Sequence, residues 1–68
     1  MAWYIVYQPR GLPRETESYA SEEDAKRAAC THRKIGRAVL ELGSEIGGTR
    51  FKKLDADGIE QMCADRPE

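Results

Sequence analysis

The sequence predicts one small α+β domain in which a single helix packs on one face of an antiparallel sheet. Two β-type segments precede residue 20, a well-delimited helix follows, and two more alternating segments flank Gly47-Gly48. Strands joined by short turns around one helix are typical of α+β domains. We predict a β-β-α-β-β order with a short additional strand, giving an antiparallel sheet of four to five strands.

The length of the chain limits the protein to a single domain, residues 1–68, with a thin core. A partner protein or a homodimer is therefore expected. Eleven basic residues oppose twelve acidic ones, which argues against a general nucleic-acid binder and leaves weak non-specific contact with nucleic acid. No apolar run is long enough to span a membrane, and the N-terminus lacks a signal-peptide pattern. We expect a cytoplasmic protein with no membrane partner.

The first two strands are read from residue type and alternation. Trp3–Tyr7 is aromatic and β-branched on both faces, which predicts a central strand. Prolines and glycine at 9–13 then interrupt regular structure. Glu15–Ala20 alternates with more polar faces, which predicts an antiparallel edge strand.

The helix over Glu22–Ile35 has the clearest signals in the chain. Ser21 is a suitable N-cap, acidic residues fill the first turn, and Gly36 is a suitable stop. Its inward stripe is Ala25, Ala28, Ala29 and His32. These small residues predict that the helix lies close to the sheet, with His32 facing the sheet edge and its charge favoured by the helix dipole.

The next segment has two interpretations. A spacing of three and four residues continues to Ile46, so one long helix is an alternative. We favour a third strand over Arg37–Gly43, because glycine inside a helix costs about 1 kcal/mol relative to alanine. Gly47-Gly48 then predicts a hairpin turn before a fourth strand over Thr49–Leu54, with Phe51 inward and a bulge or an early end of the strand near Leu54.

The C-terminal segment is read as a turn at Asp55–Gly58 followed by a short strand over Ile59–Cys63. One or two turns of helix are the alternative for 59–63. Residues 64–68 are expected to be a frayed tail.

No convincing catalytic or metal-binding set is predicted. The Asp-x-Asp-Gly at 55–58 resembles part of a calcium loop, but Lys53 and Ala64 occupy its first and last ligand positions. Cys30, His32 and Cys63 lack a fourth ligand and a zinc-type spacing. Cys30 and His32 also point about 200° apart on a helix, so they cannot act together.

We therefore expect no cofactor, no metal and no catalytic residue, and a protein that is not an enzyme. The two cysteines are expected to be buried or half-buried free thiols in a reducing compartment, and a bridge between them is the less favoured alternative. A small thiol enzyme using Cys30 or Cys63 is the rival hypothesis.

The remaining feature is a run without acids from Lys26 to Arg37. It contains the candidate partner-binding residues Lys26, Arg27, Arg33, Lys34 and Arg37. The functional interpretation is a docking surface for an acidic protein or a phosphate backbone. The alternative is an ordinary solvated helix face.

Asp24-Ala25-Lys26-Arg27 at the helix start, together with the order of elements, resembles small phage anti-CRISPR proteins that inhibit type I-F surveillance complexes. The similarity covers nearly the whole chain in pattern and only a few residues in identity. Its closing hairpin corresponds to Phe51–Gly58 here.

The resemblance implies a non-catalytic inhibitor that docks on the subunits of a crRNA-guided complex and blocks the path of target DNA. Lys26 and Arg27 match the basic positions of that family's helix. Thr31 departs from a further basic position, which Arg33 and Lys34 could replace. A bacterial or phage domain with some other protein partner is the alternative.

Overall fold

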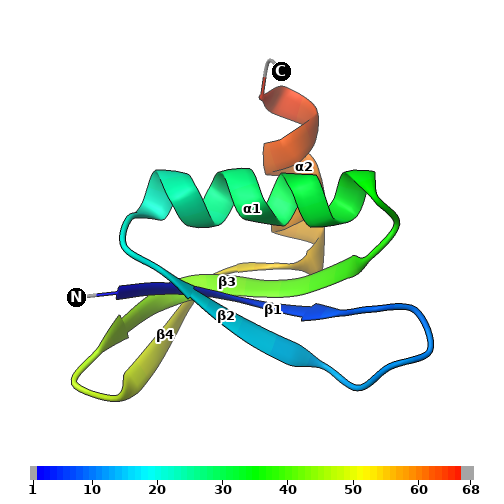
Figure 1. Ribbon diagram of the computed structural model, residues 1–68. Coiled ribbons are helices and arrows are strands. Elements are labelled where there is room, and N and C mark those ends of the chain that lie inside the picture. The colour runs from blue at the N-terminus through cyan, green and yellow to red at the C-terminus, as the bar shows by residue number, and fades with distance from the viewer. Residues whose placement is uncertain (1, 67–68) are drawn as a thin grey trace.

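The computed structural model describes residues 2–66, which form a four-stranded antiparallel sheet with two helices on one face (Figure 1). The elements are β1 (Ala2–Gln8), β2 (Glu15–Tyr19), α1 (Glu22–Lys34), β3 (Ala38–Ile46), β4 (Thr49–Asp55) and α2 (Ala56–Asp65). The strand order is β2-β1-β3-β4. The predicted α+β class and antiparallel sheet are confirmed, whereas the prediction of one helix is wrong.

β1 lies inside the sheet, as its two apolar faces predict. Ile5 and Tyr7 belong to the core beneath the helices. Tyr4 points to the opposite face, where its hydroxyl donates to Glu41 and Arg50 lies over its ring. β2 pairs with β1 alone and forms the polar edge that the sequence predicts.

α1 begins and ends where the capping signals place it. The Ser21 hydroxyl accepts from the Asp24 amide at 3.1 Å. Gly36 follows with a φ of 92°, a conformation that favours glycine. The alanine stripe faces the sheet, with Ala25 and Ala29 fully buried.

β3 confirms the strand interpretation of the ambiguous segment and rules out one long helix. Gly47 and Gly48 both have positive φ, which closes a tight hairpin into β4. The β3–β4 register shifts between Leu42↔Leu54 and Gly43↔Lys52. The bulge predicted near Leu54 is therefore present.

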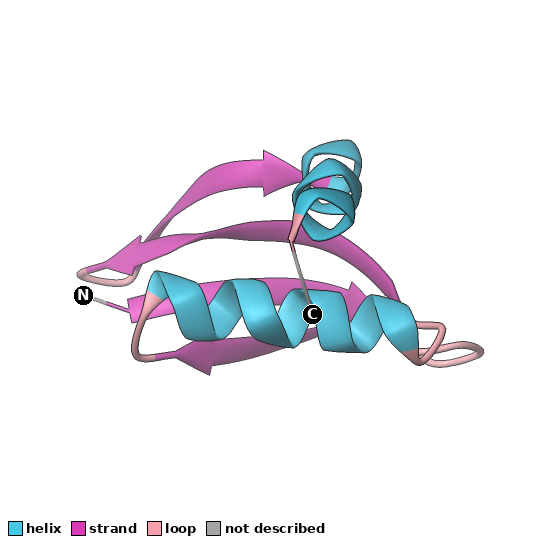
Figure 2. Ribbon diagram, turned by 90° about the horizontal axis from the view of Figure 1, so that it is seen from above, coloured by secondary structure: helices cyan, strands magenta, loops and turns pink. Residues whose placement is uncertain are grey.

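The prediction that Phe51 points into the core is wrong, because its side chain is 51% exposed. α1 packs on β1, β2 and β3, and α2 packs on β3 and β4. α2 starts at the end of β4 that is distant from the hairpin (Figure 2). Neither helix therefore covers Phe51.

α2 replaces the predicted short strand over 59–63. Asp55 is its N-cap, accepting from the Gly58 amide at 2.8 Å. A Cβ on Gly58 would lie 3.2 Å from Leu54 Cδ2, so glycine lets β4 turn directly into the helix. Ile59 then enters the core. Residues 64 and 65 belong to α2 rather than to a tail, and residues 67–68 lie outside the described part.

Within residues 2–66, neither helix has the length and apolar character needed to cross a membrane.

Candidate functional site

Five basic side chains gather at one end of the molecule, which we call the basic end: Arg10, Arg14, Arg33, Lys34 and Arg37. Gln8, the last residue of β1, pairs with Ala38, the first residue of β3. This pairing places the β1–β2 loop beside the turn between α1 and β3. Figures 1 and 2 show both connections at the same end of the sheet.

The predicted binding residues divide between the two halves of α1. Arg33, Lys34 and Arg37 belong to the basic end, whereas Lys26 and Arg27 lie in the acidic N-terminal half. The Lys26 Nζ atom lies 3.4 Å from Glu22, and the Arg27 guanidinium lies 3.8 Å from Asp24. These two cations are partly neutralised by their own helix.

The basic end combines cations with exposed apolar side chains. Within residues 2–66, Arg10 and Arg14 form no ion pair, and Arg33 lies 3.9 Å from Glu60. Leu12 and Ile35 are 59% and 60% exposed on the two adjoining connections. Apolar side chains ringed by arginine are typical of protein-binding surfaces.

His32 connects α1 to β2 and to the turn before β3. Its Nδ1 lies 3.0 Å from the Arg37 guanidinium, and its Nε2 lies 3.0 Å from Glu17 Oε1. Arginine can only donate, so this geometry sets Nδ1 as an acceptor against Arg37 and brings Nε2 to the Glu17 carboxylate.

The tyrosines around His32 complete this network. Tyr7 stacks on the imidazole with ring centroids 4.0 Å apart and donates to Glu15 at 3.1 Å. Tyr19 donates to Glu17 at 2.6 Å. Hydrogen bonds from Tyr19 and His32 lower the pKa of Glu17, while burial, followed by the Glu17 hydrogen bond, raises the pKa of Tyr19.

The network therefore holds an ionised carboxylate between protonated donors at neutral pH. Both nitrogens of His32 are engaged inside the protein. A general base needs a free nitrogen aimed at its substrate. The arrangement suits positioning of β2, α1 and Arg37 rather than proton transfer.

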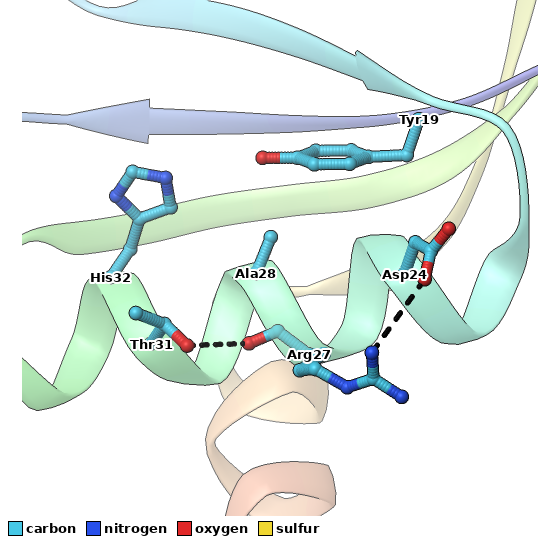
Figure 3. A pocket seen from close by; sticks show the side chains of 6 residues that line it. All are labelled: Tyr19, Asp24, Arg27, Ala28, Thr31 and His32. Carbon is cyan, nitrogen blue, oxygen red and sulfur yellow. Dashed lines mark hydrogen bonds and ion pairs between the residues drawn. The ribbon is translucent and has the colours of Figure 1, made fainter.

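An open groove of about 440 Å³ lies between β2 and α1. Figure 3 shows the Tyr19 ring beside Ala28, with its hydroxyl directed toward His32. The Thr31 hydroxyl donates to the Arg27 carbonyl oxygen at 3.0 Å. Within the described residues, no buried side-chain polar atom lacks a partner.

Cys30 and Cys63 form a disulfide that joins α1 to α2, with their Cα atoms 5.5 Å apart. The prediction of free thiols is therefore wrong. That prediction rested on the reducing compartment expected for the protein and took no account of how the two segments pack. As a helix, the segment over 59–63 places Cys63 on the same face as Ile59, four residues before it, and directs both toward the core side.

Residues 2–66 contain no group of three metal-ligating side chains. No protein-family model matches the chain, and neither the curated proteins nor the solved structures give a match.

Sequence reasoning missed Arg10 and Arg14, since the loop at 9–13 was treated only as an interruption. The proximity of this loop to the α1–β3 turn follows from the β1–β3 pairing. That long-range pairing has no local signal.

Proposed function

We propose that the chain is a non-catalytic protein-binding module that docks on an acidic face of its partner through the basic end. The observation that carries the proposal is the convergence of five cations and two exposed aliphatic side chains on the last turn of α1 and two adjoining connections. The acids of the first turn of α1 stand at the opposite end of that helix. This separation of charge orients the molecule as it approaches an acidic partner, with the basic end foremost.

The state of the reactive side chains supports a role without turnover. His32 engages both ring nitrogens, and the two cysteines are bonded to each other. His32, Cys30 and Cys63 were the candidate catalytic or metal-binding residues of the sequence, and their contacts stabilise the fold instead.

The resemblance in the sequence gives the proposal its specific partner, a crRNA-guided surveillance complex of a type I CRISPR system. Such a complex keeps a channel open for target DNA, and a compact basic domain docked at acidic subunit surfaces would obstruct it. The site of action is then the host cytoplasm, where the module acts as a monomer or a homodimer.

The test compares two pairs of arginine and lysine neutralisations that change the net charge equally. Arg10→Gln with Arg14→Gln removes two cations of the basic end. Lys26→Gln with Arg27→Gln removes two cations of the acidic half of α1. We expect the first pair to weaken binding to a purified surveillance complex about tenfold, mainly by slowing association, while the second pair changes it less than about twofold.

Surface plasmon resonance at two salt concentrations measures this difference, with circular dichroism to check the fold. Equal losses for both pairs would show that net charge alone matters. A wild-type chain that is not retained by any subunit of the complex would remove this partner from the proposal.

A further inference from the structure

We propose that the Cys30–Cys63 disulfide is a thiol–disulfide exchange site whose co-substrate is a dithiol. The bond lies between two helices instead of inside the core. It lines an open hollow of about 340 Å³ together with Arg33, Lys34, Glu60 and Ala64. Both cysteines are half-buried, so a small thiol reaches the sulfur atoms without unfolding the chain.

The charges around the two sulfur atoms are of opposite sign. Arg33 and Lys34 follow Cys30 by three and four residues on α1, so they lie over the adjoining turn. Glu60 precedes Cys63 by three residues on α2. The Arg33 guanidinium and Glu60 lie 3.9 Å apart across the hollow.

This asymmetry selects the sulfur that leaves. A nearby cation stabilises a thiolate, and a more stable thiolate is a better leaving group. Cys30 has the cations of its own helix beside it, whereas Cys63 has an acid. The incoming thiolate therefore attacks Cys63 Sγ, and Cys30 leaves as the thiolate.

Two exchanges complete the reaction. In the first, a thiolate of the dithiol bonds to Cys63 Sγ, the Cys30–Cys63 bond breaks, and the Cys30 thiolate takes up a proton. In the second, the other thiol of the reductant loses its proton and attacks the mixed disulfide. Cys63 is released and protonated, and the dithiol becomes a cyclic disulfide that has given two electrons and two protons to the protein.

Opening the bond removes the covalent link between α1 and α2. The described contacts that remain include the packing of Ile59 and Met62 against the core and two ion pairs, Arg33 with Glu60 and Arg66 with Glu23. The second half of α2 then depends on the half-buried Met62 and on surface ion pairs, which contribute little individually. Exchange at this site therefore loosens α2 from Glu60 onward.

The test measures how fast dithiothreitol reduces the oxidised chain at pH 7 and low salt. This rate depends both on access to the disulfide and on which sulfur leaves. Dithiothreitol attacks as its thiolate anion, which the cations of the hollow also attract, so the mapping experiment below decides which sulfur leaves. We expect a rate that rises linearly with its concentration. We expect Arg33→Gln with Lys34→Gln to slow reduction about threefold, and Lys26→Gln with Arg27→Gln to leave it unchanged.

The neutral monothiol 2-mercaptoethanol, followed by alkylation and peptide mapping, identifies the attacked sulfur. The mixed disulfide should be on Cys63 and the alkyl group on Cys30. A rate independent of dithiothreitol concentration would mean that reduction follows unfolding. Such a rate, a mixed disulfide mainly on Cys30, or equal slowing by the two charge pairs would overturn the proposal.

Discussion

Gly43 lies where the backbones of β3 and β4 come closest together. A Cβ at this position would stand 2.2 Å from the Phe51 carbonyl oxygen and 2.9 Å from its carbon. Backbone atoms cannot rotate away, so Gly43→Ala must displace β4. We expect a loss of about 2 kcal/mol or more in the free energy of unfolding, measured in urea.

Ser44→Ala provides the matched control on the same strand and should change stability by less than about 1 kcal/mol. If Gly43→Ala is equally mild, the close approach of the two strands at the bulge is wrong.

Glu17 makes stability depend on pH in the acid range. Its pKa is lowered by Tyr19 and His32, so the folded state binds the proton less readily than the unfolded chain does. Its contribution is fully present above about pH 5 and is lost as pH falls through the depressed folded-state value. Glu17→Gln should cost about 1 kcal/mol at pH 7.

The stabilities of the wild type and Glu17→Gln should converge toward pH 3. Urea titrations at pH 7, 5, 4 and 3 measure the difference. A constant difference over this range would mean that ionisation of Glu17 does not stabilise the fold.

Among the individual residues, part of the His32 environment could be predicted from the sequence. The alanine stripe placed His32 toward the sheet edge, where it contacts Glu17 of β2. Its contact with the Arg37 guanidinium could not be predicted, because Arg37 belongs to the turn beyond α1.

Among the elements, α2 depends most on contacts that are distant in sequence. The disulfide closes a loop with a sequence separation of 33 residues. Constraining an unfolded chain over such a loop is worth about 3–4 kcal/mol in the chain-entropy description. We expect Cys30→Ala with Cys63→Ala to lower the free energy of unfolding by about this amount.

Hydrogen exchange locates the effect of that double variant. The amides of α2 should lose more protection than those of β1 and β3, because the latter are held by the sheet. Uniform loss of protection across the chain would contradict a localised role of the bond.

The wrong predictions for residues 59–63 and for the direction of Phe51 both concern packing that the local sequence does not show. Asp55-Ala56-Asp57-Gly58 has turn composition, yet Asp55 uses its carboxylate as an N-cap and Gly58 fits against Leu54. Phe51 has the apolar character of a core residue, but no helix reaches it. β1, α1 and the Gly47-Gly48 hairpin could be predicted because their signals lie within a few residues of each other.

At the scale of the whole molecule, the two ends of the fold differ in the side chains that they expose. The basic end carries Leu12 and Ile35, whereas Ile46 and Phe51 lie at and beside the β3–β4 hairpin. The latter two side chains are each 51% exposed. The four residues therefore form two matched apolar pairs on different parts of the fold.

The most direct measurement is the affinity of these two pairs of serine variants for the surveillance complex by surface plasmon resonance. Leu12→Ser with Ile35→Ser should weaken binding about tenfold or more, because docking through the basic end would bury these two exposed aliphatic side chains against the partner. Ile46→Ser with Phe51→Ser should bind within about twofold of the wild type. The reverse result, loss of affinity only with the Ile46 and Phe51 pair, would show that the hairpin end docks and would contradict the assignment of the basic end.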